Sequence, residues 1–348
     1  MSIYMNKHMN KVITFGEIML RLMPEGYLRF VQANRLEATF GGGEANVAVS
    51  LANFGVPVSF VTKLPNNEIA QAAVNNLRQF GVGTGDIIRG GRRIGIYYAE
   101  KGASQRPSKV VYDRAGSSIA EASVSDFDWD RILEGARWFH FTGISPALSD
   151  NMAEICLAAL RKCREKGVTV SCDLNYRKNL WTREKAGAVM SGLMPFVDVC
   201  IANEEDAADV FGIAAEQTDL YGGVLNREGY KSVAKQLKDR FGFKNVCITL
   251  RTSVSASDND WAAMFYDGAE YYFSKSYKMH IVDRVGGGDS FGAGFIYASI
   301  NGFAPQDAIE FAAAASCLKH SIEGDFNHVT VDEVKKLTGG DGSGRVQR

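Results

Sequence analysis

The sequence predicts an α/β fold in which a mostly parallel sheet is covered by helices on both faces, with a second, smaller sheet beside it. Two observations lead to this prediction. Short β-branched apolar runs alternate with amphipathic helical runs along most of the chain, and the alternation is interrupted in two places. A chain of 348 residues is long enough for one large α/β unit with a small appendage. We therefore expect a three-layer sandwich of helices, sheet and helices.

Short apolar runs bounded by turn residues are expected to form the buried strands of this sheet. The expected strands are 12–15, 58–61, 138–141, 169–172, 199–202 and 246–250. The expected helices between them are 45–54, 69–80, 151–166 and 230–241. Sheets of this kind bind ligands beyond the carboxyl ends of their strands. The loops that follow Phe15, Phe141, Cys172, Ala202 and Leu250 are therefore the expected site.

The alternation breaks at residues 21–40 and 94–111. In the second stretch, strand-like runs at 95–98 and 109–112 flank a polar turn at 101–108. We expect the two stretches to pair as a small lid sheet that covers about 17–40 and 92–115. The whole folded unit is expected to span 11–338, with flexible tails at 1–10 and 339–348, and with polar surface loops at 214–228 and 252–260.

The balance of charge argues against a polyanionic partner. The chain has 39 basic and 40 acidic residues, a formal net charge of -1, and no long run of one sign. We therefore expect no binding of nucleic acid or of a membrane surface. The first ten residues lack the apolar segment of a signal peptide, and the six cysteines show no zinc or disulfide spacing. These features predict a cytoplasmic protein with reduced cysteines.

One segment joins a run of glycines to a carboxylate at the start of an apolar helix: residues 283–295 read DRVGGGDSFGAGF. Gly286, Gly287 and Gly288 permit a tight turn whose N–H groups converge at the positive end of a helix dipole, which forms an anion hole. Asp289 is placed in the first turn to accept a proton from an attacking hydroxyl. The alternative is a helix cap and a bend without a catalytic role.

This segment resembles the C-terminal signature of the ribokinase/PfkB family of carbohydrate kinases, usually DTxGAGD, from which Arg284 and Gly287 depart. Residues 41–48, GGGEANVA, resemble the N-terminal signature of the same family. The two signatures occur in the family's order, with the expected strands between them. The resemblance implies a ribokinase-like αβα sandwich with a β lid, ATP as phosphoryl donor and Mg²⁺ bridging the phosphates.

Within the family, the chain resembles the 2-keto-3-deoxygluconate kinases through short motifs at 15–17 (FGE), 112–114 (YDR), 143–144 (GI) and 173–177 (DLNYR). A keto-deoxy acid carries a carboxylate that a guanidinium can bind in bidentate fashion. The residues that the resemblance places around the acid sugar are Gly42, Tyr97, Tyr112, Arg114, Ile144 and Arg177. Each has a structural alternative, because Arg177 could be solvated or paired with Asp173, and the tyrosines could simply pack the lid.

The nucleotide side is predicted from the loops after the last strands. Asn203 and Asp206 resemble the family's Asn-x-x-Glu motif, which orders magnesium-bound water; here Asp stands in place of Glu, and Glu205 could contribute instead. An acidic helix N-terminus favoured by the helix dipole is the alternative. Thr249, Arg251 and Ser316 are the other nucleotide contacts that the resemblance implies.

The predicted reaction is therefore the ATP-dependent phosphorylation of 2-keto-3-deoxy-D-gluconate to the 6-phosphate. The alternatives are another kinase of the family, of the fructokinase or ribokinase type, and a non-catalytic sugar or nucleotide sensor on the same fold. Exposed apolar lid residues such as Ile96, Tyr98 and Val111 predict a homo-oligomer that associates through the lid.

Overall fold

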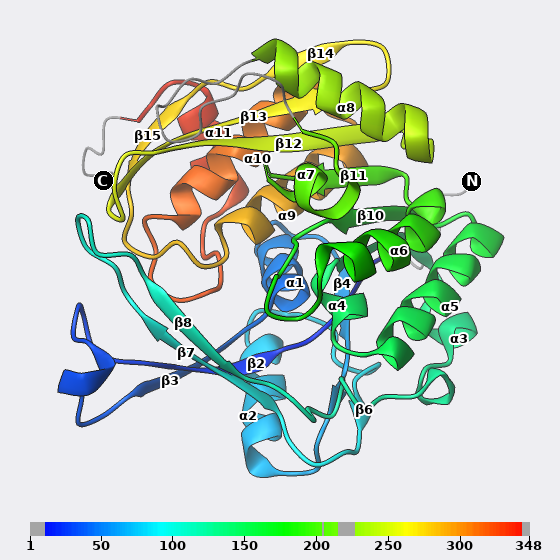
Figure 1. The fold of residues 1–348 in the computed structure, drawn as a ribbon, viewed down its shortest axis with the longest axis vertical. Helices are drawn as coiled ribbons and strands as arrows, with labels where there is room; N and C mark the ends of the chain where they lie inside the picture. Colours follow the sequence, from blue (N-terminus) through cyan, green and yellow to red (C-terminus); the bar gives the residue numbers. More distant parts are fainter. Residues whose placement is uncertain (1–10, 204, 215–226, 343–348) are drawn as a thin grey trace, which may run out of the picture.

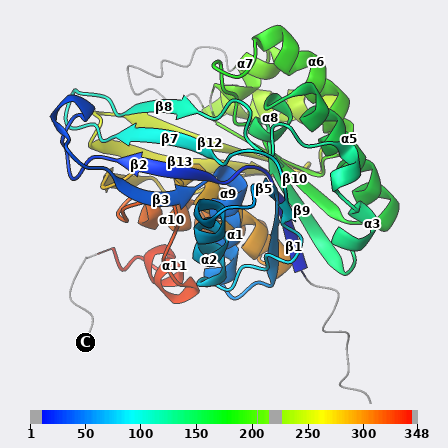
Figure 2. The same ribbon diagram turned by 90° about the horizontal axis from the view of Figure 1, so that it is seen from below.

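The computed structural model describes residues 11–203, 205–214 and 227–342. These residues form a central sheet between two layers of helices, with a second sheet projecting to one side (Figures 1 and 2). The structure thus confirms the predicted sandwich and its lid. The predicted tail at 1–10, the end of the other tail and most of the loop predicted at 214–228 lie outside the described residues.

Within the described part of the chain, the central sheet has nine strands in the order β14-β13-β12-β11-β10-β9-β1-β4, and β15 also pairs with β13. Six neighbouring strands of this sheet run parallel: β12, β11, β10, β9, β1 and β4. The strand β13 is antiparallel to β12. Their bounds are β1 Lys11–Phe15, β4 Val58–Val61, β9 Ala136–Thr142, β10 Thr169–Asp173, β11 Val199–Ala202, β12 Asn245–Ser253, β13 Asp258–Tyr266, β14 Tyr271–Phe273 and β15 Tyr277–His280. All six predicted strands are present.

Two separate apolar clusters cover the two faces of this sheet. One face is covered by α1 Gly43–Asn53, α2 Glu68–Arg78, α9 Gly287–Ile300, α10 Pro305–Lys319 and α11 Val331–Thr338. The other is covered by α3 Trp129–Ile132, α4 Ile144–Ala147, α5 Asp150–Lys166, α6 Arg183–Leu193, α7 Asp206–Phe211 and α8 Arg227–Phe241. Because both faces are buried, the parallel strands are apolar on both sides rather than alternating. In β11 all four residues are buried.

The lid is a four-stranded sheet in the order β3-β2-β7-β8. Its strands are β2 Met19–Met23, β3 Glu37–Gly41, β7 Gly95–Glu100 and β8 Lys109–Asp113, with a short 3-10 turn η1 Phe30–Gln32 between β2 and β3. A two-stranded pair of β5 Lys63–Leu64 and β6 Ile88–Arg89 lies apart from it, and η2 Val124–Asp126 and η3 Met194–Phe196 are further short turns. In Figure 1 the blue and cyan lid strands extend away from α5 and α8.

The predicted loop at 252–260 is wrong. The strand β12 continues to Ser253 and β13 begins at Asp258, so the two form an antiparallel pair in which Thr252 faces Asp260. The polar residues there are typical of a loop, but pairing with a neighbouring strand outweighs local propensity. The described residues contain no helix that is both long enough and apolar enough to cross a membrane.

Candidate active site

A cavity of about 380 Å³ lies between the lid and the carboxyl ends of the central strands. Its wall combines the start of α1, the loops after β10 and β11, the end of β12, the tip of α9 and the inner face of the lid. The predicted residues that line it are Gly42, Tyr97, Tyr112, Arg114, Ile144, Arg177, Asn203, Asp206, Thr249, Arg251, Gly286, Gly287, Gly288 and Asp289. The structure therefore brings together residues from both ends of the sequence.

The glycine turn at the tip of α9 requires glycine for two physical reasons. Gly286 has a φ of +83°, which is the left-handed region that side chains disfavour. A Cβ added at Gly286 would lie 2.1 Å from the carbonyl O of Asp325, and one at Gly287 would lie 2.3 Å from the His320 ring. The chain can pass this close to its neighbours only without side chains, so the turn and the first N–H groups of α9 are held at the cavity.

Asp289 lies in the first turn of α9, half-buried in the cavity wall. Its Oδ2 accepts a hydrogen bond of 2.7 Å from Nδ2 of Asn46 in α1. Burial raises the pKa of Asp289 to about 7; the hydrogen bond from Asn46 opposes this shift, and the negative charges of Glu44 and Asp325 add to it. A carboxylate with a pKa near neutrality is suited to accept a proton at physiological pH.

The start of α1 is shaped around the same point. A Cβ at Gly42 would lie 2.0 Å from the carbonyl O of Glu17, so the helix can approach this close only at glycine. The buried Glu44 accepts hydrogen bonds from the Thr142 backbone N–H at 2.9 Å and from the Ser145 hydroxyl at 2.7 Å, and its pKa is raised by burial. Glu44 and Asn46 belong to the N-terminal glycine motif, but sequence reasoning gave neither a role.

The lid side of the cavity presents two tyrosines and an arginine. Arg114 is 9% exposed, its guanidinium lies 5.4 Å from the centre of the Tyr112 ring, and its Nε donates to Glu17 Oε2 at 2.8 Å. Ser117 donates to the other Glu17 oxygen at 2.7 Å. Tyr97 donates its hydroxyl proton to the Asp325 carboxylate. Two of the predicted substrate contacts therefore already have partners within the protein, which fix their orientation.

Arg177 is exposed at the mouth of the cavity, after β10. Its Nη1 donates to the Tyr176 carbonyl O at 2.9 Å. Nearby, burial raises the pKa of Asp173 well above its usual range, with the negative charges of Asp206 and Asp289 adding to the shift and the charge of Arg177 opposing it. Asn175, between them, has a φ of +39°, which is uncommon outside glycine. The loop thus crowds acidic and basic groups at one edge of the cavity.

The loop after β11 carries the predicted metal-side residues. The Asn203 Oδ1 accepts from the backbone N–H groups of Glu205 and Asp206 at 2.8 and 2.9 Å, which forms an Asx turn just before α7. Asp206 is buried; its two oxygens accept from the backbone N–H groups of Tyr176 at 3.0 Å and Asn203 at 3.3 Å, and burial raises its pKa. Glu205 does not line this cavity but an adjoining groove.

Ser316 does not contact the cavity, contrary to its predicted role as a nucleotide contact. It is fully buried in α10, and its hydroxyl donates to the Gly287 carbonyl O at 2.7 Å. Ser316 therefore supports the glycine turn from behind. The sequence alone could not show this, because which face of a helix meets a cavity depends on how that helix packs.

Several cavity residues were not predicted from the sequence. They are chiefly charged or aromatic side chains at the lid and beside the glycine turn: Arg21, Glu100, Lys101, Trp261, Asp283, Arg284, His320 and Asp325. Arg21 and Asp325, which form an ion pair, are 304 positions apart in the chain. No local pattern indicates such a pair, because only the folded chain brings its members together.

A family model and a solved structure of a carbohydrate kinase both match nearly the whole chain. Residues 9–327 match the model of the pfkB family carbohydrate kinases. The crystal structure of 2-dehydro-3-deoxygluconokinase from Thermotoga maritima is 55% identical, with a TM-score of 0.92, over 95% of this chain and 100% of that chain.

Two curated relatives extend the comparison. The 2-dehydro-3-deoxygalactonokinase of Haloferax volcanii is 32% identical over 95% of this chain and 98% of its own length. The 2-dehydro-3-deoxygluconokinase of Bacillus subtilis is 26% identical over 92% of this chain and 93% of its own length. Both alignments therefore run over nearly the whole of this chain and of the relative.

Proposed function

The chain belongs to the pfkB family of carbohydrate kinases, and from this premise we propose that it transfers the γ-phosphoryl group of ATP to the 6-hydroxyl of 2-keto-3-deoxy-D-gluconate. One observation carries the substrate assignment. The 2-dehydro-3-deoxygluconokinase of Thermotoga maritima matches this chain at 55% identity over its whole length. The arginines and tyrosines that line the lid side of the cavity provide a chemical reason for an acid substrate.

Asp289 is the proposed base. As the substrate O6 attacks, the O6–P bond forms, the bond from the γ-phosphorus to the β,γ-bridging oxygen breaks, and the O6 proton passes to the Asp289 carboxylate. ADP leaves with the bond's electron pair. The pKa of about 7 means that the carboxylate is largely available as base above neutral pH. Asn46 holds one carboxylate oxygen at 2.7 Å and so orients the side chain.

The tip of α9 is the proposed anion hole. Gly286, Gly287 and Gly288 keep side chains away from the cavity, and the helix dipole adds positive potential where charge develops on the transferred phosphoryl group. Arg251, which also lines the cavity, is a proposed phosphate contact on the nucleotide side. Because the base and the anion hole share one helix turn, the attacking hydroxyl and the transferred phosphoryl group are positioned by the same element.

The carboxylate of the acid sugar is the proposed ligand of Arg114 and Arg177. Arg177 is exposed at the cavity mouth, so its guanidinium can turn toward a bound anion. Arg114 is held by Glu17, which offsets part of its charge and fixes its plane. Tyr97, Tyr112, Gly42 and Ile144 complete the proposed contacts with the sugar carbons and hydroxyls.

A magnesium ion fits this site as one held mainly by the phosphates and by water. Among the described residues, no group of three or more His, Cys, Asp or Glu side chains is arranged for direct metal binding. Asp206 lines the cavity, with its oxygens accepting from backbone N–H groups, and is suited to hydrogen-bond metal-bound water. When bound, the ion would neutralise charge on the phosphates.

A second substrate is favoured by one comparison. The Haloferax volcanii relative, 32% identical, is a 2-dehydro-3-deoxygalactonokinase, and its substrate differs from 2-keto-3-deoxygluconate in configuration at C4.

The deciding experiment is an ADP-release assay with both epimers, fructose and ribose. We expect kcat/KM to be highest for one of the two keto-deoxy acids. Equal or better turnover of the neutral sugars would indicate a fructokinase or ribokinase type, and absence of turnover with ATP binding would indicate a sensor.

A homo-oligomer formed through the lid is also proposed. The lid carries several exposed apolar side chains, among them Val31 at 91%, Val111 at 53% and Tyr27 at 55% exposed. A Val111→Glu variant should shift the mass in light scattering from the oligomer to the monomer. A wild-type chain that is already monomeric would contradict this proposal without affecting the proposed reaction.

A further inference from the structure

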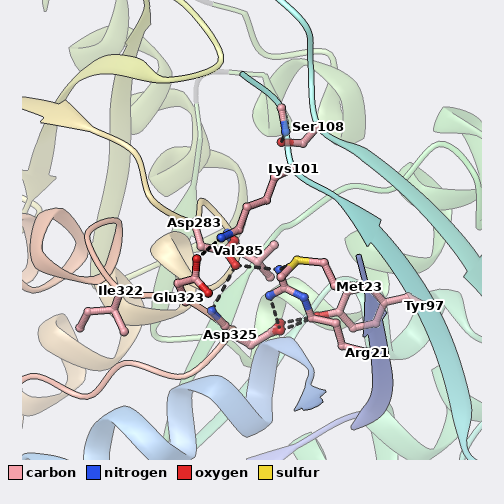
Figure 3. A network of polar contacts seen from close by, with 12 residues as sticks. Arg21, Met23, Tyr97, Lys101, Ser108, Asp283, Val285, Ile322, Glu323 and Asp325 are labelled. Carbon is pink, nitrogen blue, oxygen red and sulfur yellow. Dashed lines mark hydrogen bonds and ion pairs between the residues drawn. The ribbon is translucent and has the colours of Figure 1, made fainter. Parts of the chain in front are cut away.

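A buried cluster of charges connects the lid to the glycine turn. Arg21, on β2 of the lid, is 1% exposed. Its Nη2 lies 2.7 Å from Asp283 Oδ2, and its Nη1 lies 3.0 Å from Asp325 Oδ1 (Figure 3). The two carboxylates come from different segments, one just before α9 and one after α10. One guanidinium therefore joins three parts of the chain in the interior.

Asp283 through its carboxylate and Asp325 through its backbone carbonyl also lie against the glycine turn or its supporting loop. The Asp283 Oδ1 accepts from the Val285 backbone N–H at 3.1 Å, and its Oδ2 accepts from the Gly324 backbone N–H at 3.1 Å. The Asp325 carbonyl O lies against Gly286, where a Cβ would come within 2.1 Å. Since both aspartates contact the backbone of the turn or its supporting loop, a shift of Arg21 would be transmitted to the anion hole.

The lid end of the cluster reaches the proposed sugar contacts. Arg21 and Tyr97 are direct neighbours in the register of β2 and β7. Tyr97 donates to the same Asp325 carboxylate that Arg21 binds, and Lys101, at the end of β7, forms an ion pair with Glu323 of the same loop (Figure 3). A ligand that contacts Tyr97 therefore touches a strand whose position depends on the segments behind the anion hole.

We propose that Arg21 is a positioning residue that couples the two halves of the site, so that the acid sugar and the nucleotide each bind more tightly when the other is present. This inference rests on the proposed function. The physical basis is that Arg21 is desolvated and bound by two carboxylates, so the lid strand and the glycine turn adopt their paired positions together or not at all. A ligand on either side stabilises that one arrangement and thereby favours the binding of the other ligand.

The balance of charge in the cluster makes Arg21 difficult to replace. Arg21 and the buried Lys319, which donates to the Ile322 carbonyl O at 3.0 Å, provide two positive charges against Asp283 and Asp325. Loss of Arg21 leaves an excess negative charge directly behind a site that must accept a triphosphate. The same loss frees β2 from both segments, so coupling and nucleotide affinity are both expected to fall.

The test is the dissociation constant of the non-hydrolysable nucleotide AMP-PNP with Mg²⁺, measured by calorimetry with and without 2-keto-3-deoxygluconate. In the wild-type chain we expect the sugar acid to tighten nucleotide binding about fivefold or more. In Arg21→Met the ratio should fall to about one. Arg35→Met is the matched control, because Arg35 lies between β2 and β3 and pairs with Glu25 at the exposed lid tip, where both side chains are largely solvated. It should retain the wild-type ratio.

A purely structural role for Arg21 would lower the melting temperature without changing this ratio in the folded protein. If Arg21→Met does not fold, Arg21→Lys decides, since an ammonium keeps the charge but cannot bind both carboxylates in the same geometry; a reduced ratio is expected. An unchanged ratio in a folded Arg21 variant overturns the inference. A wild-type chain that binds both ligands without mutual effect also overturns it, while leaving the proposed function intact. A wild-type chain that does not bind the sugar acid overturns the proposed function, and this inference with it.

Discussion

The central sheet and the lid sheet are stabilised in different ways. The central strands lie between two large apolar clusters, and residues such as Phe139 and Ile201 are at most 2% exposed. The lid has an apolar cluster of four buried residues, Met19, Met23, Tyr97 and Ala99. Its inner face is joined to the rest of the protein through the ion pairs of Arg21 with Asp283 and Asp325 and of Lys101 with Glu323.

This difference means that the central sheet supplies most of the protein's stability, whereas the position of the lid can respond to a charged ligand. Apolar burial is non-directional and does not depend on a ligand, so the central strands and the helices packed on them keep one arrangement. Ion pairs and hydrogen bonds are directional and sensitive to nearby charge. The lid is therefore the part of the molecule whose position a charged ligand can influence.

The largest expected effect is at the helix tip that the central sheet supports. Asp289→Asn should lower kcat by about two to four orders of magnitude, because the amide cannot accept the proton of the attacking hydroxyl. Single-turnover kinetics with saturating substrates measure this loss. Asp307→Asn, in the first turn of α10 and exposed, is the matched control and should keep wild-type kcat. Near-normal turnover of Asp289→Asn would contradict the assigned base.

The contrast in stability can be tested with one truncation in each sheet. Phe139→Ala, in the aromatic cluster of β9, should lower the free energy of unfolding by about 3–5 kcal/mol, since it removes a fully buried ring. Leu22→Ala, on the half-buried outer face of β2, should cost about 1 kcal/mol or less. Urea unfolding monitored by circular dichroism gives both values. Equal costs would show that the lid is as tightly packed as the central sheet.

Recognition of the substrate's charge at the mouth of the cavity, beyond β10 of the central sheet, is tested at Arg177. Arg177→Gln should raise KM for the keto-deoxy acid about 10- to 100-fold, as expected for the loss of a charge-assisted hydrogen bond, with a smaller effect on kcat. Steady-state kinetics at saturating ATP give both constants. Lys178→Gln provides the comparison, because Lys178 is exposed and lines the adjoining groove rather than the cavity. A similar KM for the wild type and the Arg177 variant would place the substrate carboxylate elsewhere.

The smallest expected effect concerns pH. Since burial raises the pKa of Asp289 to about 7, kcat/KM should rise with pH through that value as the carboxylate forms. The hydrogen bond from Asn46 favours the carboxylate, so Asn46→Ala should move this acid limb to higher pH, by about one unit at most. Asn53→Ala is the control. Asn53 lies in α1, like Asn46, but donates to the Asn327 carbonyl O, so its loss should leave the acid limb unchanged. A shift to lower pH would refute the assignment.

Local patterns were sufficient for the parts of the protein that depend on neighbouring residues. The apolar runs predicted all six parallel strands, because burial on both faces leaves a continuous hydrophobic signal. The glycine turn before α9 was recognisable because backbone crowding at Gly286 excludes side chains. The hairpin of β12 and β13 was missed, since its polar residues are stabilised by a partner strand and not by their own propensity.

By itself, the sequence determined the layered architecture, the glycine turn and the carboxylate beside it, because each of these depends on short-range sterics and periodicity. Only the tertiary structure decided which charged groups meet. In the folded chain Arg21 forms ion pairs with Asp283 and Asp325, and Arg114 forms an ion pair with Glu17. The Ser316 hydroxyl binds the Gly287 carbonyl O and does not line the cavity. Such contacts join distant segments, and their energies come from a desolvated environment that exists only once the chain has folded.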